Sequence, residues 1–123
     1  MKIKVRKEDI FNYVMYQDYM YIISDQNNYV KVGISKNPTK RLSQLQTGHP
    51  TKLQLIYTVE FECSRNQLLK IEDLVHKKIR EKIKHAVGEW FEVTNDQIEE
   101  IKSIIEWCRI RYEQDTLYFK YRI

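Results

Sequence analysis

Apolar residues recur along the chain with the short period of a β-strand in some stretches and the longer period of an α-helix in others. Residues 19–24 and 29–35 are rich in aromatic and β-branched side chains, and turn-forming residues separate them, so we expect a β-hairpin. Apolar and polar residues alternate over 53–61, which predicts a third, half-buried strand. The side chains expected on its buried face are Leu53, Leu55, Tyr57, Val59 and Phe61.

A first helix is expected directly after the hairpin. Asn37 is a good N-cap, and Pro38 suits the first helical position because an amide proton there would have no partner within the helix. This helix should turn Leu42 and Leu45 inward and end near Gly48.

Two further helices begin at capping boxes. Ser64 with Gln67 opens a helix that should run to about residue 85, and Thr94 with Gln97 opens another. Residues 116–123 alternate again and favour a terminal strand. The predicted fold is therefore α+β: a small three-stranded antiparallel sheet, made of the hairpin plus the third strand, flanked by helices and followed by an added C-terminal helix.

The composition is that of one globular domain spanning 1–123, with 42% hydrophobic and 31% charged residues. No apolar run approaches the ~18 residues of a membrane span, and no apolar segment follows the basic start. We therefore expect a cytoplasmic protein without a secretory signal. The two cysteines, Cys63 and Cys108, are too few for a cysteine-based zinc site of ordinary pattern.

The excess positive charge lies in one segment. The chain has 21 Lys+Arg and 17 Asp+Glu, but residues 26–59 contain no acidic residue. The basic residues of this segment are Lys31, Lys36, Lys40, Arg41 and Lys52. Without them, 16 basic residues stand against 17 acidic ones elsewhere. The segment is either a solvated basic surface or, in the interpretation we favour, a surface that binds phosphates.

Two polar residues interrupt the apolar stripe of the long predicted helix. Glu72 falls inside the stripe, and His76 lies at its edge one turn later. A carboxylate facing a core is costly unless it is paired. The two side chains therefore either satisfy one another or a nearby backbone group, or they belong to a functional site.

Lys31 and Arg41 are candidates for the same site. Neighbours on a strand point to opposite faces, so Lys31 projects away from Val30 and Val32, onto the face that carries Tyr21. A lysine beside a tyrosine would lower the pKa of the phenol. Arg41 projects near the apolar stripe of its helix, where it either covers apolar neighbours or offers a planar fork of donors to a phosphate.

Glu89 lies between Gly88 and the aromatic pair Trp90-Phe91. This setting holds its carboxylate at a defined place, where it would face the tyrosine, lysine and arginine. Because hard cations prefer oxygen donors, Glu89 is a candidate ligand for Mg²⁺.

Taken in order, these residues resemble the GIY-YIG endonuclease superfamily. The matching pieces are Tyr19-Met20-Tyr21, Lys31-Val32-Gly33, Arg41, Glu72 with His76, and Gly88-Glu89-Trp90-Phe91. They are most similar to the small branch, common in phage and bacterial proteins, whose second motif reads K-(V/I)-G and whose tail motif reads G-E-W-F. Two positions depart from the usual motifs, since Tyr19 replaces the first glycine and Lys31 the second tyrosine. The similarity covers residues 19–93, which would form a catalytic core with 1–18 and 94–123 as extensions packed on it.

The resemblance implies a nuclease that hydrolyses DNA phosphodiesters with one divalent ion, Mg²⁺ or Mn²⁺. It implies that Tyr21 helps to deprotonate the attacking water and that Lys31 supports this step. Arg41 would bind the scissile phosphate, His76 would contact phosphate or water, and Glu89 would bind the metal. The residues expected to bind the nucleic acid or to support the site are Lys36, Lys40, Lys52, Gly33 and Glu72.

Two other functions fit the same sequence. The acid-free basic segment and the missing motif glycine also fit a catalytically inactive, nuclease-derived DNA-binding or regulatory module. A factor that binds a protein partner is a further alternative. In the favoured interpretation the partner is DNA and no membrane is involved, and the chain is a monomer or a homodimer.

Overall fold

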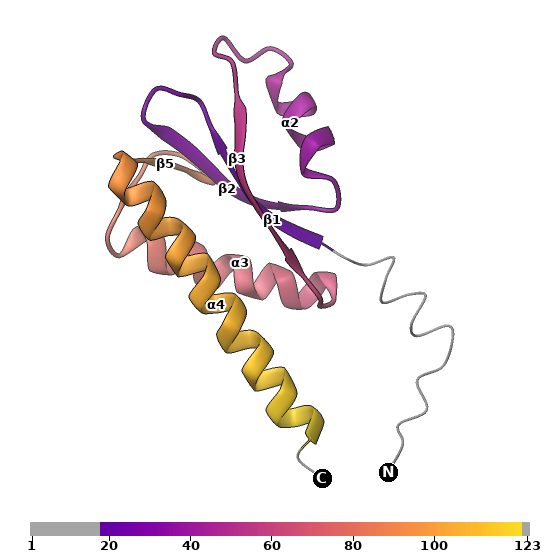
Figure 1. Ribbon diagram of the computed structural model, residues 1–123. Helices are drawn as coiled ribbons and strands as arrows, with labels where there is room; N and C mark the ends of the chain where they lie inside the picture. Colours follow the sequence, from indigo (N-terminus) through magenta and orange to yellow (C-terminus); the bar gives the residue numbers. More distant parts are fainter. Residues whose placement is uncertain (1–17, 122–123) are drawn as a thin grey trace.

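The computed structural model describes residues 18–121, and it has an open antiparallel sheet with α2 on one face and α3 and α4 on the other (Figure 1). In chain order the elements are β1 (Asp18–Ser24), β2 (Tyr29–Ser35), α2 (Pro38–Gln46), β3 (Gln54–Phe61), α3 (Arg65–Arg80), β4 (Lys84–His85), β5 (Trp90–Glu92) and α4 (Asn95–Tyr121). The extension expected at 1–18 lies, apart from Asp18, outside the described residues.

The sheet has five strands in the order β3-β1-β2-β5-β4. The α+β class, the β1–β2 hairpin and the third strand are confirmed. The expected number of three strands is wrong because β4 and β5 extend the sheet beyond β2. These two strands have two and three residues, which is too short to give a periodic signal in the sequence.

A β-bulge in β3 contradicts the single apolar face expected for this strand. Ile22 pairs with Tyr57 and the next residue, Ile23, pairs with Leu55, so Ile56 is the extra residue. Leu55 therefore packs on the α2 side of the sheet, whereas Tyr57 packs on the side of α3 and α4.

Helix α3 ends at Arg80 and does not continue to about residue 85 as predicted. A turn follows, in which the amide of Ile83 donates to the carbonyl of Ile79 at 2.8 Å. His85 then pairs with Phe91 as part of β4. Pairing with β5 thus replaces the last helical turn that the apolar pattern favours.

The strand expected at 116–123 is also wrong, because α4 continues through residue 121; residues 122–123 lie outside the described part of the chain. No glycine or proline follows Thr94, so nothing in the sequence stops the helix once it has started.

The helix starts agree with the sequence prediction. The Asn37 side chain accepts a hydrogen bond from the amide of Lys40 at 3.1 Å, and Pro38 follows this N-cap. Both capping boxes form as well, and they start α3 and α4. Within residues 18–121, no helix combines the length and the apolar character that crossing a membrane requires.

The sheet separates two apolar clusters. The larger one joins Met20, Ile22, Val30 and Val32 to the buried faces of α3 and α4. The smaller one contains Tyr21, Ile23 and Leu53 and is covered by Leu42 and Leu45 of α2 and by Trp90. The two faces of β1 therefore carry the side chains that strand alternation assigns to them.

Candidate active site

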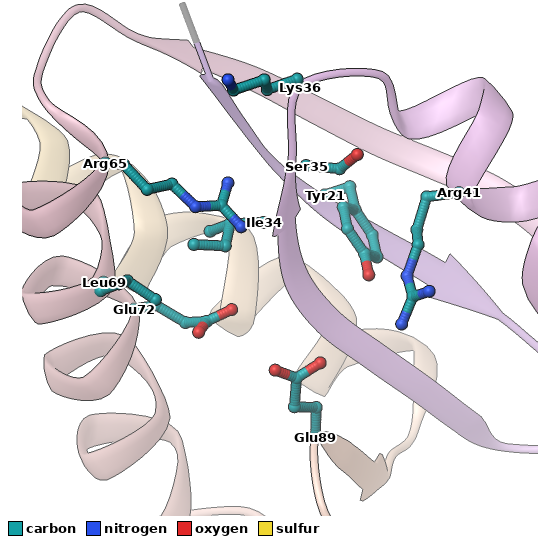
Figure 2. A pocket seen from close by; sticks show the side chains of 9 residues that line it. All are labelled: Tyr21, Ile34, Ser35, Lys36, Arg41, Arg65, Leu69, Glu72 and Glu89. Atoms are coloured by element: carbon teal, nitrogen blue, oxygen red, sulfur yellow. The ribbon is translucent and has the colours of Figure 1, made fainter. Parts of the chain in front are cut away.

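A pocket of about 610 Å³ opens beside the second half of β2. Strand β5 pairs with β2 only from Tyr29 to Lys31, so no described strand covers this edge of β2 beyond Lys31. Residues of α2 and α3 reach the edge from opposite sides of β2 (Figure 2). The titratable side chains that line the pocket are Tyr21, Lys36, Arg41, Arg65, Glu72 and Glu89.

The Tyr21 ring lies over Gly33, its partner in the β1–β2 pairing. A Cβ atom on Gly33 would lie 2.5 Å from the Tyr21 Oη and 2.7 Å from its Cζ. It would also lie 3.2 Å from Glu89 Oε2. Because Gly33 has no side chain, the phenol of Tyr21 can occupy the space beside the pocket. This explains why a glycine ends the motif Lys31-Val32-Gly33.

We predict that Gly33→Ala displaces Tyr21 from the pocket. The added methyl group cannot coexist with a buried phenol at 2.5 Å, so the ring or the strand must move. Overpacking of this kind costs about 1–3 kcal/mol of stability. Thermal unfolding should show a fold that survives with a lower melting temperature. An unchanged melting temperature would mean that the site accommodates a Cβ atom at Gly33 without moving Tyr21.

Tyr21 makes its polar contact with Arg41. Burial is the main influence on the phenol and raises its pKa above the ordinary value of 10.0. The hydrogen bond with Arg41 lowers the pKa, while the charge of Glu89 raises it again. The sequence-based expectation of a lowered tyrosine pKa is therefore wrong.

Lys31 is paired with Glu89 instead. Its Nζ donates to Glu89 Oε2 while its backbone stands opposite Ile23 in the hairpin. Lys31 is buried, with a side chain 8% exposed, whereas the Glu89 side chain is 37% exposed and borders the pocket. The lysine thus neutralises and orients the carboxylate.

The backbone fixes Glu89 between β4 and β5. Gly88 adopts a φ of +57°, a left-handed conformation that suits glycine. The carbonyl of Glu89 then accepts a hydrogen bond from the amide of Val32 at 3.1 Å. The conformation of Gly88 and the hydrogen bond to Glu89 therefore place the Glu89 carboxylate at the open edge of β2.

Glu72 is the second carboxylate of the pocket and projects from α3 toward the same space as Glu89 (Figure 2). The residue is 8% exposed, and its Oε2 is buried without a hydrogen-bond partner. Burial, followed by the charges of Glu89 and Asp73, raises the pKa of Glu72 to about 7. An unsatisfied buried carboxyl beside a second acid is unfavourable for folding, and perturbed groups of this kind are typical of functional sites.

The structure does not bring His76 into the pocket lining. Its Nε2 lies 2.7 Å from the carbonyl oxygen of Val32, so this nitrogen carries a proton and donates it. The ring also packs edge-on against Phe91, with centroids 5.6 Å apart, and burial lowers its pKa. A backbone group thus satisfies His76, one of the alternatives that the sequence left open, while Glu72 has no such partner on Oε2.

The donor set of the pocket fits a hard cation better than zinc. The described residues include no cluster of three or more His, Cys, Asp or Glu side chains that could hold a metal ion. Mg²⁺ keeps several waters and is commonly bound by one or two carboxylates together with substrate phosphates. Glu72 and Glu89 could supply that number of protein ligands, because both residues line the pocket.

The three lysines expected to bind nucleic acid lie in different places. Lys36 lines the pocket, and Lys40 is exposed on α2. Lys52 is exposed in the segment before β3, outside the pocket lining, and its carbonyl accepts a hydrogen bond from Gln26. The sequence did not single out Arg65, which follows the N-cap of α3 and also lines the pocket.

The fold is of the α+β class, its pocket gathers basic and acidic side chains, and a family match suggests a nuclease-like or DNA-binding module. The chain belongs to the T5orf172 domain family, whose match covers residues 18–109. This is a phage-associated domain of the nuclease-related set, and the match does not single out the GIY-YIG superfamily within that set. Searches of curated proteins and of solved structures found no match.

Proposed function

We propose that the protein is a metal-dependent DNA endonuclease that hydrolyses phosphodiester bonds by a one-metal mechanism of the GIY-YIG type. The observation that carries this proposal is the meeting of an arginine, a tyrosine and two carboxylates in one pocket. They come from four parts of the chain: β1, α2, α3 and the segment before β5. Membership in a nuclease-related family supports the same reaction class.

Arg41 binds the scissile phosphate in this proposal. Its guanidinium borders the pocket beside Tyr21 (Figure 2). A planar fork of donors can hold two phosphate oxygens at once and stabilises the negative charge that gathers in the transition state.

Tyr21 positions the attacking water and accepts its proton. Arg41 orients the phenol by the hydrogen bond between them, and burial fixes the ring. Glu89 and Glu72 would hold one Mg²⁺ or Mn²⁺ ion, which would supply positive charge to stabilise the leaving group. Lys31 keeps the Glu89 carboxylate in place, and the buried His76 holds the backbone of β2 through Val32.

The pH dependence of cleavage follows from the raised pKa of Tyr21. A base acts in its deprotonated form, so a phenol with a pKa above 10.0 leaves only a small active fraction at neutral pH. We expect the cleavage rate to rise about tenfold per pH unit from about pH 7 to about pH 10. Tyr21→Phe should lower the rate and flatten this profile. A wild-type plateau near neutral pH would assign the base to another group.

A catalytically inactive DNA-binding module is the second candidate. Two observations favour it. Lys31 forms an ion pair with one oxygen of the Glu89 carboxylate, and burial favours the protonated form of the Tyr21 phenol. Such a module would bind DNA equally well with and without divalent cations.

One experiment separates the two functions. Labelled duplex and single-stranded DNA are incubated with the folded protein in Mg²⁺, in Mn²⁺ and in EDTA, and both binding and cleavage are measured. The proposed nuclease cleaves in at least one metal and not in EDTA. Binding that is indifferent to metal, with intact DNA throughout, supports the inactive module and overturns the nuclease.

A further inference from the structure

Arg65 occupies a position that helix stability alone does not favour. It is the first residue of α3, directly after the Ser64 N-cap. Because the N-terminus of a helix carries a partial positive charge, acidic residues are preferred in the first turn. The first turn of α3 has none and carries an arginine instead.

A fully buried carboxylate holds this arginine. Asp18 is 0% exposed, and its Oδ1 accepts a hydrogen bond from Arg65 Nη1 at 2.9 Å. The other oxygen of Asp18 is buried without a hydrogen-bond partner. Burying a carboxylate is expensive, and a hydrophobic residue at this place would avoid the penalty. The charge of Asp18 therefore serves to anchor the guanidinium.

The anchored arginine still faces solvent. The Arg65 side chain is 44% exposed, and a guanidinium has several N–H donors, of which Asp18 engages Nη1. Arg65 borders the same pocket as Arg41, and Figure 2 shows the two guanidinium groups on opposite sides of β2. If a strand of DNA crossed the open edge of β2 with one phosphate at Arg41, a neighbouring phosphate would lie on the side of Arg65.

We propose that Arg65, anchored by Asp18, forms a second phosphate subsite that binds the phosphodiester next to the scissile one. This subsite rests on the proposed nuclease function, because Arg41 defines which phosphate is scissile. Lys36 on the same pocket wall adds positive charge along the path of the backbone. The guanidinium groups of Arg41 and Arg65, on either side of β2, would fix the position of the DNA strand along the pocket. They would keep the scissile phosphate next to the carboxylates.

The test measures DNA binding over a range of salt concentrations, with cleavage rates alongside. Arg65→Gln alone leaves Asp18 buried and unpaired, so the decisive comparison is Asp18→Asn/Arg65→Gln against Asp18→Asn. Both of these variants lack the buried charge, and they differ only in the arginine. Lys70→Gln, which removes one exposed charge from α3 outside the pocket lining, is the control for net charge.

Loss of Arg65 should weaken DNA binding about tenfold at low salt and reduce the slope of log K against log salt by about 1, the value for one phosphate contact. Asp18→Asn should keep the wild-type slope, because it retains the cation, but should raise KM. Lys70→Gln should retain the slope and KM of the wild type.

Equal slopes and affinities for Asp18→Asn and the double variant, in a protein whose parent cleaves DNA, overturn the subsite and leave the nuclease intact. A parent protein that neither binds nor cleaves DNA overturns both. A fall in melting temperature without a change in slope shows that Arg65 only supports the fold, which also overturns the subsite.

Discussion

Replacing Glu72 by glutamine is expected to abolish metal-dependent cleavage and, at about pH 8, to make the protein more stable. The pKa of Glu72 is raised from 4.5 to about 7, so the folded state favours the protonated form. The stability penalty therefore appears as the pH rises from about 4.5 and is complete above about 7. Glutamine stays neutral and removes a penalty on the order of 2 kcal/mol.

In this variant the melting temperature should rise while the cleavage rate falls. We expect a gain in melting temperature of roughly 5–8 °C at about pH 8 and none below about pH 4.5. Cleavage should fall at least about a thousandfold because the pocket loses a charged oxygen ligand. Added Mg²⁺ or Mn²⁺ should stabilise the wild type but not Glu72→Gln.

The matched control is Asp73→Asn, which removes an exposed acid from the neighbouring position of α3. It should keep the cleavage rate within about threefold of the wild type. A Glu72→Gln variant that cleaves normally would show that the carboxylate has no part in the reaction. A variant that loses stability at alkaline pH would show that the carboxylate of Glu72 is satisfied in the fold.

Replacing Arg41 by alanine is the second change for which we expect a large effect. The side chain is the polar partner of Tyr21 and borders the pocket from α2. Its loss removes the donors for the scissile phosphate and frees the phenol. We expect the cleavage rate at saturating DNA to fall about a thousandfold.

Two further variants show whether the effect belongs to the guanidinium. Arg41→Lys keeps the charge without the planar fork and should recover only part of the rate. Gln44→Ala changes an exposed side chain of the same helix and should cleave as the wild type does. Full activity in Arg41→Ala would contradict its assignment to the scissile phosphate.

The sequence predicted the elements whose signals are local. A cap needs only a side chain and an amide a few residues away, so Asn37 and Ser64 identify the starts of α2 and α3. The alternation in β1 likewise assigns Tyr21 and Ile22 to opposite faces. The bulge at Ile56 escaped prediction because it depends on how β3 pairs with β1 and not on the residues of β3 alone.

The sequence indicated several of the residues that share the pocket, but not which side chains contact one another. Tyr21, Arg41 and Glu89 do meet in one pocket. The partner of Lys31, however, is 58 residues away in the chain and is brought near by β5, a strand too short to predict. Glu72 was visible as a polar residue in an apolar stripe, but its unpartnered oxygen becomes evident only once α3 is packed.

Arg65 was missed for a related reason. Nothing near it in the sequence identifies Asp18 as its partner, since the contact joins β1 to the start of α3. The available signal was a basic residue in a first helical turn, where the helix dipole disfavours it. His76 is the opposite case, a residue that the sequence singled out. Its place in a family motif suggested a contact with phosphate or water, whereas its ring forms a hydrogen bond with the backbone of β2.

Cleavage of supercoiled plasmid by the wild type and Glu89→Ala, side by side in Mg²⁺ and in Mn²⁺, tests the central claim most directly. Circular dichroism of both proteins confirms that they are folded. The proposed mechanism predicts nicked or linear product from the wild type, none in EDTA, and a loss of product in Glu89→Ala with DNA binding retained. Intact plasmid with the folded wild type in both metals, or equal cleavage by the two proteins, would contradict it.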